Sequence, residues 1–371
     1  MLPPAKFRGR YVRPKTILAA TMAVGSLLAV ASPASAAAFS FTTIDVPGAI
    51  PGSTRTRAGG INNSGQIVGS FVAGATTHGF LDTGGSFTTI DVPGASGAGT
   101  VASGINDAGQ IVGDFQDGTT THGFLKVGGS FTPIDVPAPL PPPGTVRFTV
   151  ARGINDAGQI VGNFGFGTNA ADSHGFLDTG GSFTQLDVPG GFGTAARGIN
   201  EAGQIVGDFQ DSTTMHGFLD VGGSFTTIDV PGARSTSAQG INDAGQIVGY
   251  FIDSTGDHGF LDASGSFTII DVPGASFTTA EGINNAGQIV GTSESSFAVA
   301  HGFLATPVSM VPEPSSLALL SVGVIVLWTI RRRKCRQPIR LRLATTVGPR
   351  PARRRGAPRS GQAAFTRLQG G

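Results

Sequence analysis

The stretch that decides the fold is residues 198–232, GINEAGQIVGDFQDSTTMHGFLDVGGSFTTIDVPG. It contains three β-rich phrases, GINxxGQIVG, HGFL and FTTIDVPG, and each recurs six times, with small variations, in the chain of 371 residues. The period is 42 residues in the best-kept copies and 52 in the longest. Self-similarity at such a period is typical of solenoids and propellers, so the sequence predicts a repeat architecture.

Each repeat is expected to form four short strands. The first approaches and includes Gly-Ile-Asn, the second is Gln-Ile-Val-Gly and usually a following Phe, the third is His-Gly-Phe-Leu, and the fourth is Phe-Thr-Thr-Ile-Asp-Val. β-Branched and aromatic residues fill these segments. Asn-Asp-Ala-Gly and Gly-Gly-Ser provide the turns, and proline ends the fourth strand. Four strands per period predict one blade of a β-propeller.

The order of the phrases at the two ends favours a closed ring. A lone fourth strand begins at Phe41, ahead of the first GIN, and the last HGFL begins at His301 with no fourth strand after it. A ring can place the N-terminal strand beside the last one, whereas an open solenoid needs distinct capping repeats. We therefore expect an all-β, six-bladed β-propeller over residues 37–307, closed by the N-terminal strand. A β-solenoid with two coils per repeat is the alternative.

Composition and charge narrow the functional classes. Hydrophobic residues make up 39% of the chain, charged residues 13%, and 58 residues are glycine. Residues 37–310 hold seven basic and 23 acidic residues, which disfavours nucleic-acid binding because phosphates require Lys and Arg. The single cysteine, Cys335, lies outside the repeats, so the repeat region is expected to fold as a monomer without disulfides.

The N-terminal 36 residues are predicted to be a secretory signal peptide. Five basic residues precede an apolar run at 16–31, and Ala34-Ser35-Ala36 supplies the small residues that a signal peptidase requires. We expect cleavage after Ala36, with cleavage after Ala38 as the near alternative. A short buried helix is the other interpretation of the run, and its terminal position and flanking charges disfavour it.

Residues 308–334 are predicted to be a second targeting segment, which directs the chain to the membrane. The sequence VPEPSSLALLSVGVIVLWTI at 311–330 is followed by Arg331, Arg332, Arg333 and Lys334. As a transmembrane helix the 14 apolar residues from 317 would span about 21 Å, which is short for a bilayer. The basic cluster is expected to act as a membrane stop on the cytoplasmic side. Residues 335–371, rich in Arg, Pro and Gly, are expected to be a disordered tail.

This C-terminal arrangement resembles the PEP-CTERM sorting signal of exopolysaccharide-producing Gram-negative bacteria. The resemblance implies that Pro312, Glu313 and Pro314 form the recognition site of an exosortase, a membrane-embedded cysteine protease-transpeptidase. It also suggests a membrane-anchored precursor and a mature protein at the cell surface or outside it. One departure is the tail, since proteins with this signal usually end soon after the basic cluster.

The repeats resemble the HAF family of extracellular repeats. The resemblance rests on GINxxGQIVG and on the histidine-containing strand, where His-Gly-Phe stands in place of His-Ala-Phe, and it covers nearly all of residues 41–304. It implies an exported protein but brings no reaction or ligand.

Repeated polar residues are interpreted as structural. One histidine per repeat is expected to make the same local hydrogen bond in each repeat, rather than to bind metal in a ring: His78, His122, His174, His216, His258 and His301. The aspartates before Val-Pro are expected to accept neighbouring backbone N–H groups: Asp45, Asp91, Asp135, Asp187, Asp229 and Asp271.

Several connections between the second and third strands are predicted to be acidic. Their aspartates are Asp114, Asp117, Asp208, Asp211, Asp253 and Asp257. They are expected to keep the surface soluble, with binding of Ca²⁺ or of a cationic glycan as the lesser alternative and no other cofactor.

The sequence favours a non-catalytic surface or matrix protein. It lacks the motifs of nucleophilic, metal-dependent or phosphate-binding enzymes. An enzyme should break the repeat symmetry with unmatched polar residues at one channel mouth, and we expect no such set. The variable connections, for example 138–149 and 163–173, are the expected binding face, although unconstrained drift explains them equally well. The expected partners are an exosortase, the membrane and extracellular polysaccharide. The alternatives are a secreted propeller enzyme acting on glycans or lactones, and an architectural spacer.

Overall fold

The computed structural model describes residues 38–47, 55–96, 99–118, 120–137, 148–166, 172–295 and 299–308. Within these ranges the chain forms 24 β-strands and no α-helix. None of the described residues belongs to a helix long and apolar enough to span a membrane. The predicted signal peptide with Ala34 and Ala36, the sorting motif with its helix and basic cluster, and the tail all lie outside the described residues.

Each repeat folds into an antiparallel unit in which sequence neighbours are also neighbours in space. The first unit contains β2 (Thr56–Ile61), β3 (Gln66–Ala73), β4 (Thr76–Thr83) and β5 (Ser86–Ile90), in that order. Tight turns join the strands because glycines such as Gly65 and Gly84, with φ of 77° and 61°, accept a left-handed backbone. The four strands of the prediction are therefore present.

The next repeats give the same succession of strands. The second and third units are β6 (Thr100–Ile105), β7 (Ile111–Asp117), β8 (Thr120–Val127), β9 (Ser130–Ile134), β10 (Phe148–Ile154), β11 (Gln159–Gly165), β12 (Ser173–Thr179) and β13 (Ser182–Leu186). The fourth and fifth are β14 (Phe192–Ile199), β15 (Ile205–Gln210), β16 (Met215–Val221), β17 (Ser224–Ile228), β18 (Ser235–Ile241), β19 (Gln246–Ile252), β20 (Asp257–Ala263) and β21 (Ser266–Ile270).

The last unit takes its fourth strand from the other end of the chain. β22 (Phe277–Ile283), β23 (Ile289–Glu294) and β24 (Ala300–Val308) pair in sequence, and β1 (Ala38–Ile44) then adds to β24. The antiparallel register sets Phe41 opposite Ala305 and Ile44 opposite Gly302. The N-terminal strand therefore occupies the place that the sequence predicts for it.

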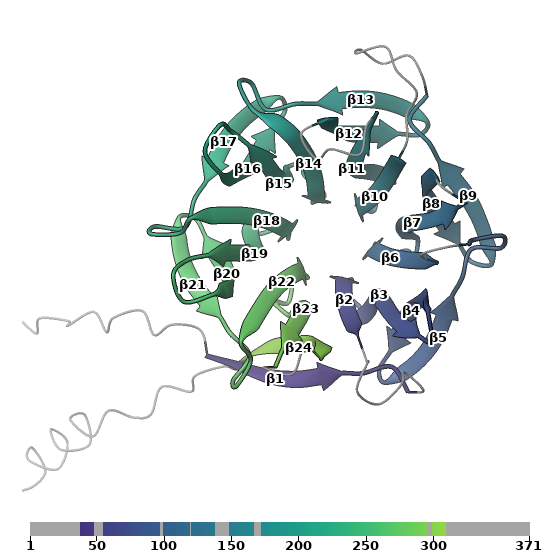
Figure 1. The fold of residues 1–371 in the computed structure, drawn as a ribbon, viewed down its shortest axis with the longest axis horizontal. Helices are drawn as coiled ribbons and strands as arrows, with labels where there is room; N and C mark the ends of the chain where they lie inside the picture. Colours follow the sequence, from purple (N-terminus) through teal and green to yellow (C-terminus); the bar gives the residue numbers. More distant parts are fainter. Residues whose placement is uncertain are drawn as a thin grey trace, which may run out of the picture. The chain divides into compact units, whose positions relative to one another are not determined.

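The units stand in a ring around a common axis (Figure 1). The first strand of each unit lies nearest the centre, and the fourth strand lies at the rim. β22 of the last unit contacts β2 of the first. This arrangement is propeller-like and differs from the open solenoid that the sequence left as the alternative.

A circle of asparagine hydrogen bonds connects the inner strands. Asn62 Nδ2 donates to the backbone oxygen of Asn106 at 3.1 Å, and the corresponding asparagines repeat this bond from unit to unit. Asn284 in turn donates to the backbone oxygen of Asn62, also at 3.1 Å. These buried asparagines hold their own turns as well, since Asn62 Oδ1 accepts the N–H of Gln66. We call this circle the asparagine belt: Asn62, Asn106, Asn155, Asn200, Asn242 and Asn284.

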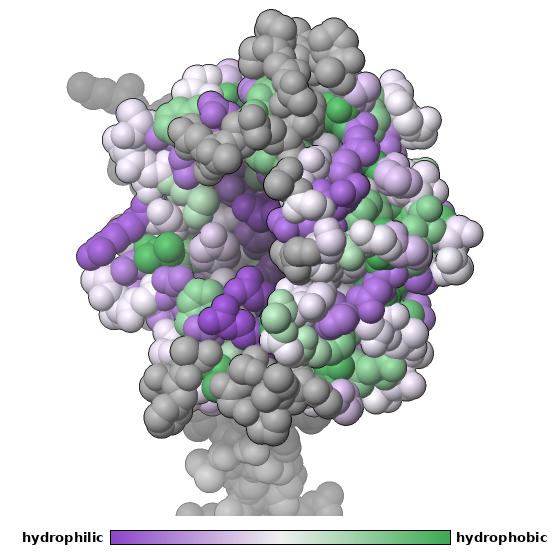
Figure 2. All heavy atoms as spheres, turned by 45° about the vertical axis from the view of Figure 1, so that its right-hand side comes forward, coloured by the Kyte–Doolittle hydropathy of each residue, from purple (hydrophilic) through white to green (hydrophobic). Residues whose placement is uncertain are grey.

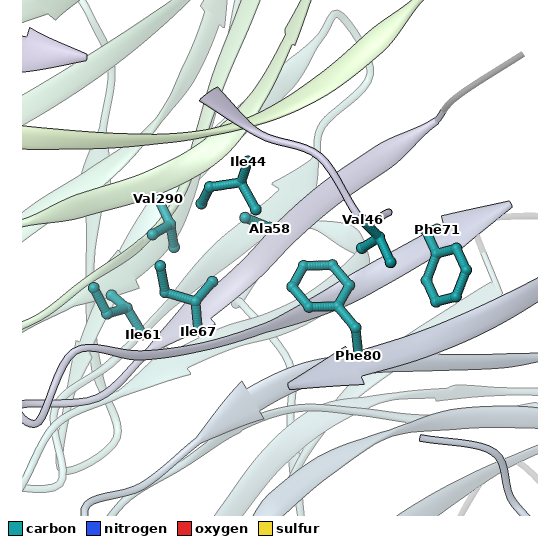
Figure 3. Close-up of a cluster of buried hydrophobic side chains, with 8 residues drawn as sticks. All are labelled: Ile44, Val46, Ala58, Ile61, Ile67, Phe71, Phe80 and Val290. Atoms are coloured by element: carbon teal, nitrogen blue, oxygen red, sulfur yellow. The ribbon is translucent and has the colours of Figure 1, made fainter. Parts of the chain in front are cut away.

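The hydrophobic core lies between adjacent units. In the cluster drawn in Figure 3, Ile61, Ile67 and Phe80 of the first repeat meet Val290 of the last repeat and Ile44 of the N-terminal strand. All five are buried. Residues from both ends of the repeat region thus share one core, and burying a side chain of this size is typically worth about 1.5–3 kcal/mol.

Glycine in QIVG permits the close stacking of strands. A Cβ on Gly113 would lie 2.0 Å from the backbone oxygen of Val101 and 2.9 Å from the ring of Phe124. The phenylalanine is fully buried directly over this glycine. The phrase therefore requires glycine for space, in addition to the glycines that serve turns.

Two strand boundaries differ from the prediction. The fourth strand ends at isoleucine, for instance Ile228, and the following Asp229 and Val230 lie outside it. Four aspartates that the sequence assigns to the connections lie in strands instead: Asp114 and Asp117 in β7, Asp208 in β15 and Asp257 in β20. These aspartates pair across to strand residues, because the ladder continues until the chain turns.

Candidate functional site

The repeated histidines and aspartates meet each other. Each histidine Nδ1 lies 2.8–2.9 Å from a carboxylate oxygen of the aspartate after the adjoining fourth strand. The pairs are His78–Asp91, His122–Asp135, His174–Asp187, His216–Asp229, His258–Asp271 and His301–Asp45. The expectation that these aspartates serve neighbouring backbone N–H groups is wrong, since the imidazole is their partner. No histidine ring around the channel exists, because each histidine lies on the third strand of its unit.

The pairs differ in their surroundings. His216 also has Asp211 at 3.4 Å from its Nε2. Burial lowers the pKa of His216, but the hydrogen bond and charge of Asp229 and the charge of Asp211 outweigh burial, so its pKa lies above its usual value. Among the described residues, no group of three or more His, Cys, Asp or Glu side chains is arranged to hold a metal ion.

Asp211 and Asp253 accept hydrogen bonds from residues of their own loops. Asp211 Oδ1 accepts hydrogen bonds from the backbone N–H groups of Thr213 and Thr214 and from the Thr213 hydroxyl. These bonds hold the pKa of Asp211 well below its usual range. Asp253 makes the same contacts with Thr255, and its pKa is lowered for the same reason. These carboxylates cap turns.

The repeat symmetry breaks in the central channel. A cavity of about 420 Å³ there is lined by Arg57, Arg152, Arg197, Gln239, Tyr250 and Glu281, among others. A smaller hollow of about 130 Å³ shares Arg57, Arg152, Arg197, Gln239 and Glu281. Figure 2 shows a hydrophilic hollow in the middle of the ring. We call the larger of the two, of about 420 Å³, the channel cavity. The expectation that no unmatched polar set lines the channel is therefore wrong.

Apart from Arg57, three residues before its GIN phrase, and Asp257, directly before its HGFL phrase, the unmatched residues occupy two equivalent positions of the repeat. One is the residue before GIN, which is Gly59, Ser103, Arg152, Arg197, Gln239 and Glu281 in successive repeats. The other follows QIVG and is Ser70, Asp114, Asn163, Asp208, Tyr250 and Thr292. The surrounding phrases are nearly invariant, so the change at these positions was visible in the sequence. Sequence reasoning missed it because it sought motifs rather than departures from the repeat.

One ion pair organises part of the cavity. Arg197 Nε donates to Asp208 Oδ1 at 2.5 Å, and the carboxylate, with 7% of its side chain exposed, also accepts from Ser237 at 2.9 Å. Gln239 Nε2 donates to the same serine at 2.7 Å. Burial lowers the pKa of Arg197, but the charge and hydrogen bond of Asp208 outweigh burial and raise it. This guanidinium is therefore fixed and neutralised.

The other arginines of the cavity are differently placed. The Nε atom of Arg152 is buried and has no hydrogen-bond partner among the described residues. Burial and the charge of Arg197 lower the pKa of Arg152, although Asp114 and Glu281 oppose this. No described residue pairs with the exposed Arg57 either. Two guanidinium groups in the cavity thus have donors to offer.

Two carboxyl groups complete the charge of the cavity region. Burial raises the pKa of Asp114, and the charge of Arg152 offsets this in part. Glu281 Oε1 accepts a hydrogen bond from Thr279 at 3.2 Å. Burial also raises the pKa of the Tyr250 phenol. The lining itself therefore holds three arginines, Arg57, Arg152 and Arg197, and two acids, Asp257 and Glu281. Asp114 and Asp208 interact with Arg152 and Arg197 from outside the lining.

Comparison with known families finds one match. Residues 311–334 match the PEP-CTERM protein-sorting motif. This signal implies an exported protein, made as a membrane-anchored precursor and sorted by an exosortase. The match covers only the C-terminal sorting signal, and no curated protein matches the chain. The resemblance of the repeats to the HAF family stays a prediction.

Solved structures of low similarity align with 71–73% of this chain. They include an Aleuria aurantia lectin in complex with α-methyl-L-fucoside, at 13% identity and a TM-score of 0.45, over 71% of this chain and 93% of that one. AofleA from Arthrobotrys oligospora has 14% identity and a TM-score of 0.47 over 73% and 91%. A protein of unknown function from Dyadobacter fermentans has 11% identity and a TM-score of 0.48 over 72% and 99%. At these TM-scores, the likenesses carry no argument about ligand or activity.

Proposed function

We propose that the chain is a non-catalytic surface or matrix protein that binds extracellular polysaccharide in the channel cavity of a six-bladed propeller. The observation that carries the binding proposal is the departure from symmetry. A pure spacer needs no polar variation inside its channel, yet arginine, glutamine, tyrosine and glutamate replace one another there while the flanking phrases repeat. Buried polar groups are costly unless something compensates them, which favours a ligand.

The proposed six-bladed ring rests on hydrogen bonds that return to their start. Besides the asparagine belt, a second circle runs from the backbone N–H of Asn63 to Asp107 and onward until the N–H of Asn285 donates to Asn63 Oδ1 at 2.8 Å. Both circles take one residue from each repeat. A helical solenoid would leave the first and last members unpaired.

The proposed organisation has four parts. Residues 1–36 are a signal peptide cleaved after Ala36, 37–307 the propeller, 308–334 the sorting signal with a transmembrane helix, and 335–371 a basic tail. Pro312, Glu313 and Pro314 are the proposed exosortase site, and Arg331, Arg332, Arg333 and Lys334 the membrane stop. The family match over 311–334 supports the sorting part of this proposal.

Cell fractionation with a polysaccharide-binding assay tests the proposed function. The wild-type chain, expressed in an exosortase-containing host, should be recovered in the envelope or medium and co-sediment with that host's exopolysaccharide. A chain with Pro312, Glu313 and Pro314 all replaced by alanine should accumulate as an unprocessed precursor. Cytoplasmic wild-type protein, or exported protein that does not co-sediment with the polysaccharide, would overturn the proposal.

A secreted glycan-processing enzyme is the second candidate, and Asp114 favours it. A carboxyl group whose pKa is raised by burial is what a general acid requires, and Asp114 lies next to the charge of Arg152, a residue of the channel cavity. Incubating the purified chain and its Asp114→Asn variant with the exopolysaccharide separates the candidates. The binding function predicts no new reducing ends with either protein, whereas an enzyme would release them only with the wild type.

A further inference from the structure

We propose that the channel cavity recognises a carboxylate-bearing sugar, so that its ligand is a hexuronic acid residue of an acidic glycan. This inference rests on the proposed polysaccharide-binding function and names the chemical class of the residue bound.

Two arginines of the channel cavity can bind an anion. Arg152 and Arg57 both line the cavity, and neither makes a hydrogen bond or ion pair with a described residue, although the charges of Asp114 and Glu281 attract Arg152. A guanidinium presents its N–H donors in a planar fork that matches a carboxylate in two parallel bonds. Arg197 is unsuited to this role because Asp208 already occupies its Nε. The anion-binding groups are therefore Arg152 and Arg57.

The acids of the lining favour an anion with a single negative charge. The lining holds three arginines and two acids, Asp257 and Glu281, and Arg197 is already paired with Asp208 outside the lining. A ligand with one negative charge can bind the unpartnered guanidiniums, and Asp257 and Glu281 repel it less strongly than a ligand with two negative charges. A phosphate monoester or a sulfate cluster brings more charge and would meet these carboxyl groups. A single carboxylate is the better match.

The remaining lining residues can contact the hydroxyl groups and ring of a sugar. Gln239 donates from its amide, Glu281 accepts, and Tyr250 can do either, so the wall offers partners of both kinds to hydroxyl groups. The polar lining is interrupted by Ile252 and Phe277, which can contact the apolar edge of a sugar ring. Small-molecule sites commonly have volumes of about 300–1,000 Å³. At about 420 Å³, the cavity accepts a ligand of one or two sugar rings.

Titration calorimetry on the purified full-length chain in detergent tests the inference. The probes are a hexuronate and the corresponding neutral hexose. The wild type should bind the hexuronate at least tenfold more tightly. Arg152→Gln should weaken hexuronate binding at least tenfold, and Arg152→Lys should weaken it less, because the charge stays while the fork is lost. Lys126→Gln is the matched control, because Lys126 lies on β8 outside the cavity lining. This substitution should leave hexuronate binding unchanged.

Arg57→Gln keeps the test independent of folding, because Arg57 is exposed at the mouth and its loss should leave the unfolding temperature unchanged. It too should weaken hexuronate binding. Equal affinity for the two sugars, no hexuronate binding by the wild type, or full binding by both arginine variants would overturn the inference. If the arginine variants still co-sediment with the exopolysaccharide, the proposed function stands and only its cavity assignment fails. If the wild type does not co-sediment, the proposed function itself fails.

Discussion

The carboxylate of Asp45 lies 2.8 Å from Nδ1 of His301, although 256 residues separate them in the chain. The same pair elsewhere joins residues only 13 positions apart. The geometry at the junction of the two ends therefore equals that inside a continuous repeat. The N-terminal strand supplies the missing member of the last unit, down to its side-chain contact.

The asparagine belt should be equally strong at the junction and away from it. Asn284→Ala removes the bond to Asn62 across the junction, and Asn200→Ala removes the equivalent bond to Asn242 within the chain. Each substitution removes a buried bond to the next repeat and the side-chain acceptor of its own turn, as in Gln288 N–H to Asn284 Oδ1, and should lower the free energy of unfolding by about 1–3 kcal/mol. Urea unfolding of both variants checks this. A clearly smaller loss for Asn284→Ala would mean that the belt is open at the junction.

The glycine of QIVG should tolerate no side chain. Gly113→Ala places a methyl group 2.0 Å from the backbone oxygen of Val101, so the strands must move apart and the free energy of unfolding should fall by about 3 kcal/mol or more. Gly129→Ala is the matched control, because a Cβ there meets nothing within 4 Å. It should change stability by less than about 0.5 kcal/mol. Equal unfolding midpoints for the two variants would contradict the packing described here.

The His216–Asp229 pair should make stability depend on pH in a defined direction. The folded-state pKa of His216 is raised, so its stabilisation is complete below about 6.5, the unfolded value, and is lost as the pH rises through the folded value. Asp229→Asn removes the hydrogen bond and the charge that raise this pKa. The variant should lose less stability than the wild type between pH 5.5 and 8.5.

The measurement is urea unfolding across this range, with an NMR titration of the His216 ring as a check on the group responsible. The Asp271→Asn variant serves for comparison in another repeat. A decline with pH that is the same in the wild type and in Asp229→Asn would contradict the assignment.

Much of this architecture could be predicted from sequence, because it depends on local chemistry. The turn glycines, the β-branched strands and the place of the strand at Phe41 follow from residue type and from the order of the phrases. The histidine–aspartate pair could not be inferred from either residue alone, since each has a local explanation. Their constant spacing of 13 positions was the signal that both belong to one contact.

The channel cavity needed the structure. Arg57 in β2 of the first repeat and Glu281 in β22 of the last repeat line the same cavity, and they meet only because the ring closes. Asp114 and Asp208 resemble loop residues in the sequence, since each precedes Phe and a polar stretch, but the strand ladder carries them into the interior. Position in a repeat decides which face a residue takes, and that position becomes clear only when the repeats are aligned in space.

Closure by the N-terminal strand is the central claim, because the channel cavity exists only in a closed ring. Within β1, Ile44 is buried and Thr43 is exposed. Ile44→Ala should therefore cost about 2–5 kcal/mol, whereas Thr43→Ala should cost less than about 0.5 kcal/mol.

The most direct test is calorimetric unfolding of the full chain with and without residues 41–48. Deletion removes the buried Ile44 and Val46 and exposes the edge of β24. A closed ring predicts that the whole repeat region melts at least about 10 °C lower, as one transition. An unchanged melting temperature with equal cooperativity would contradict closure.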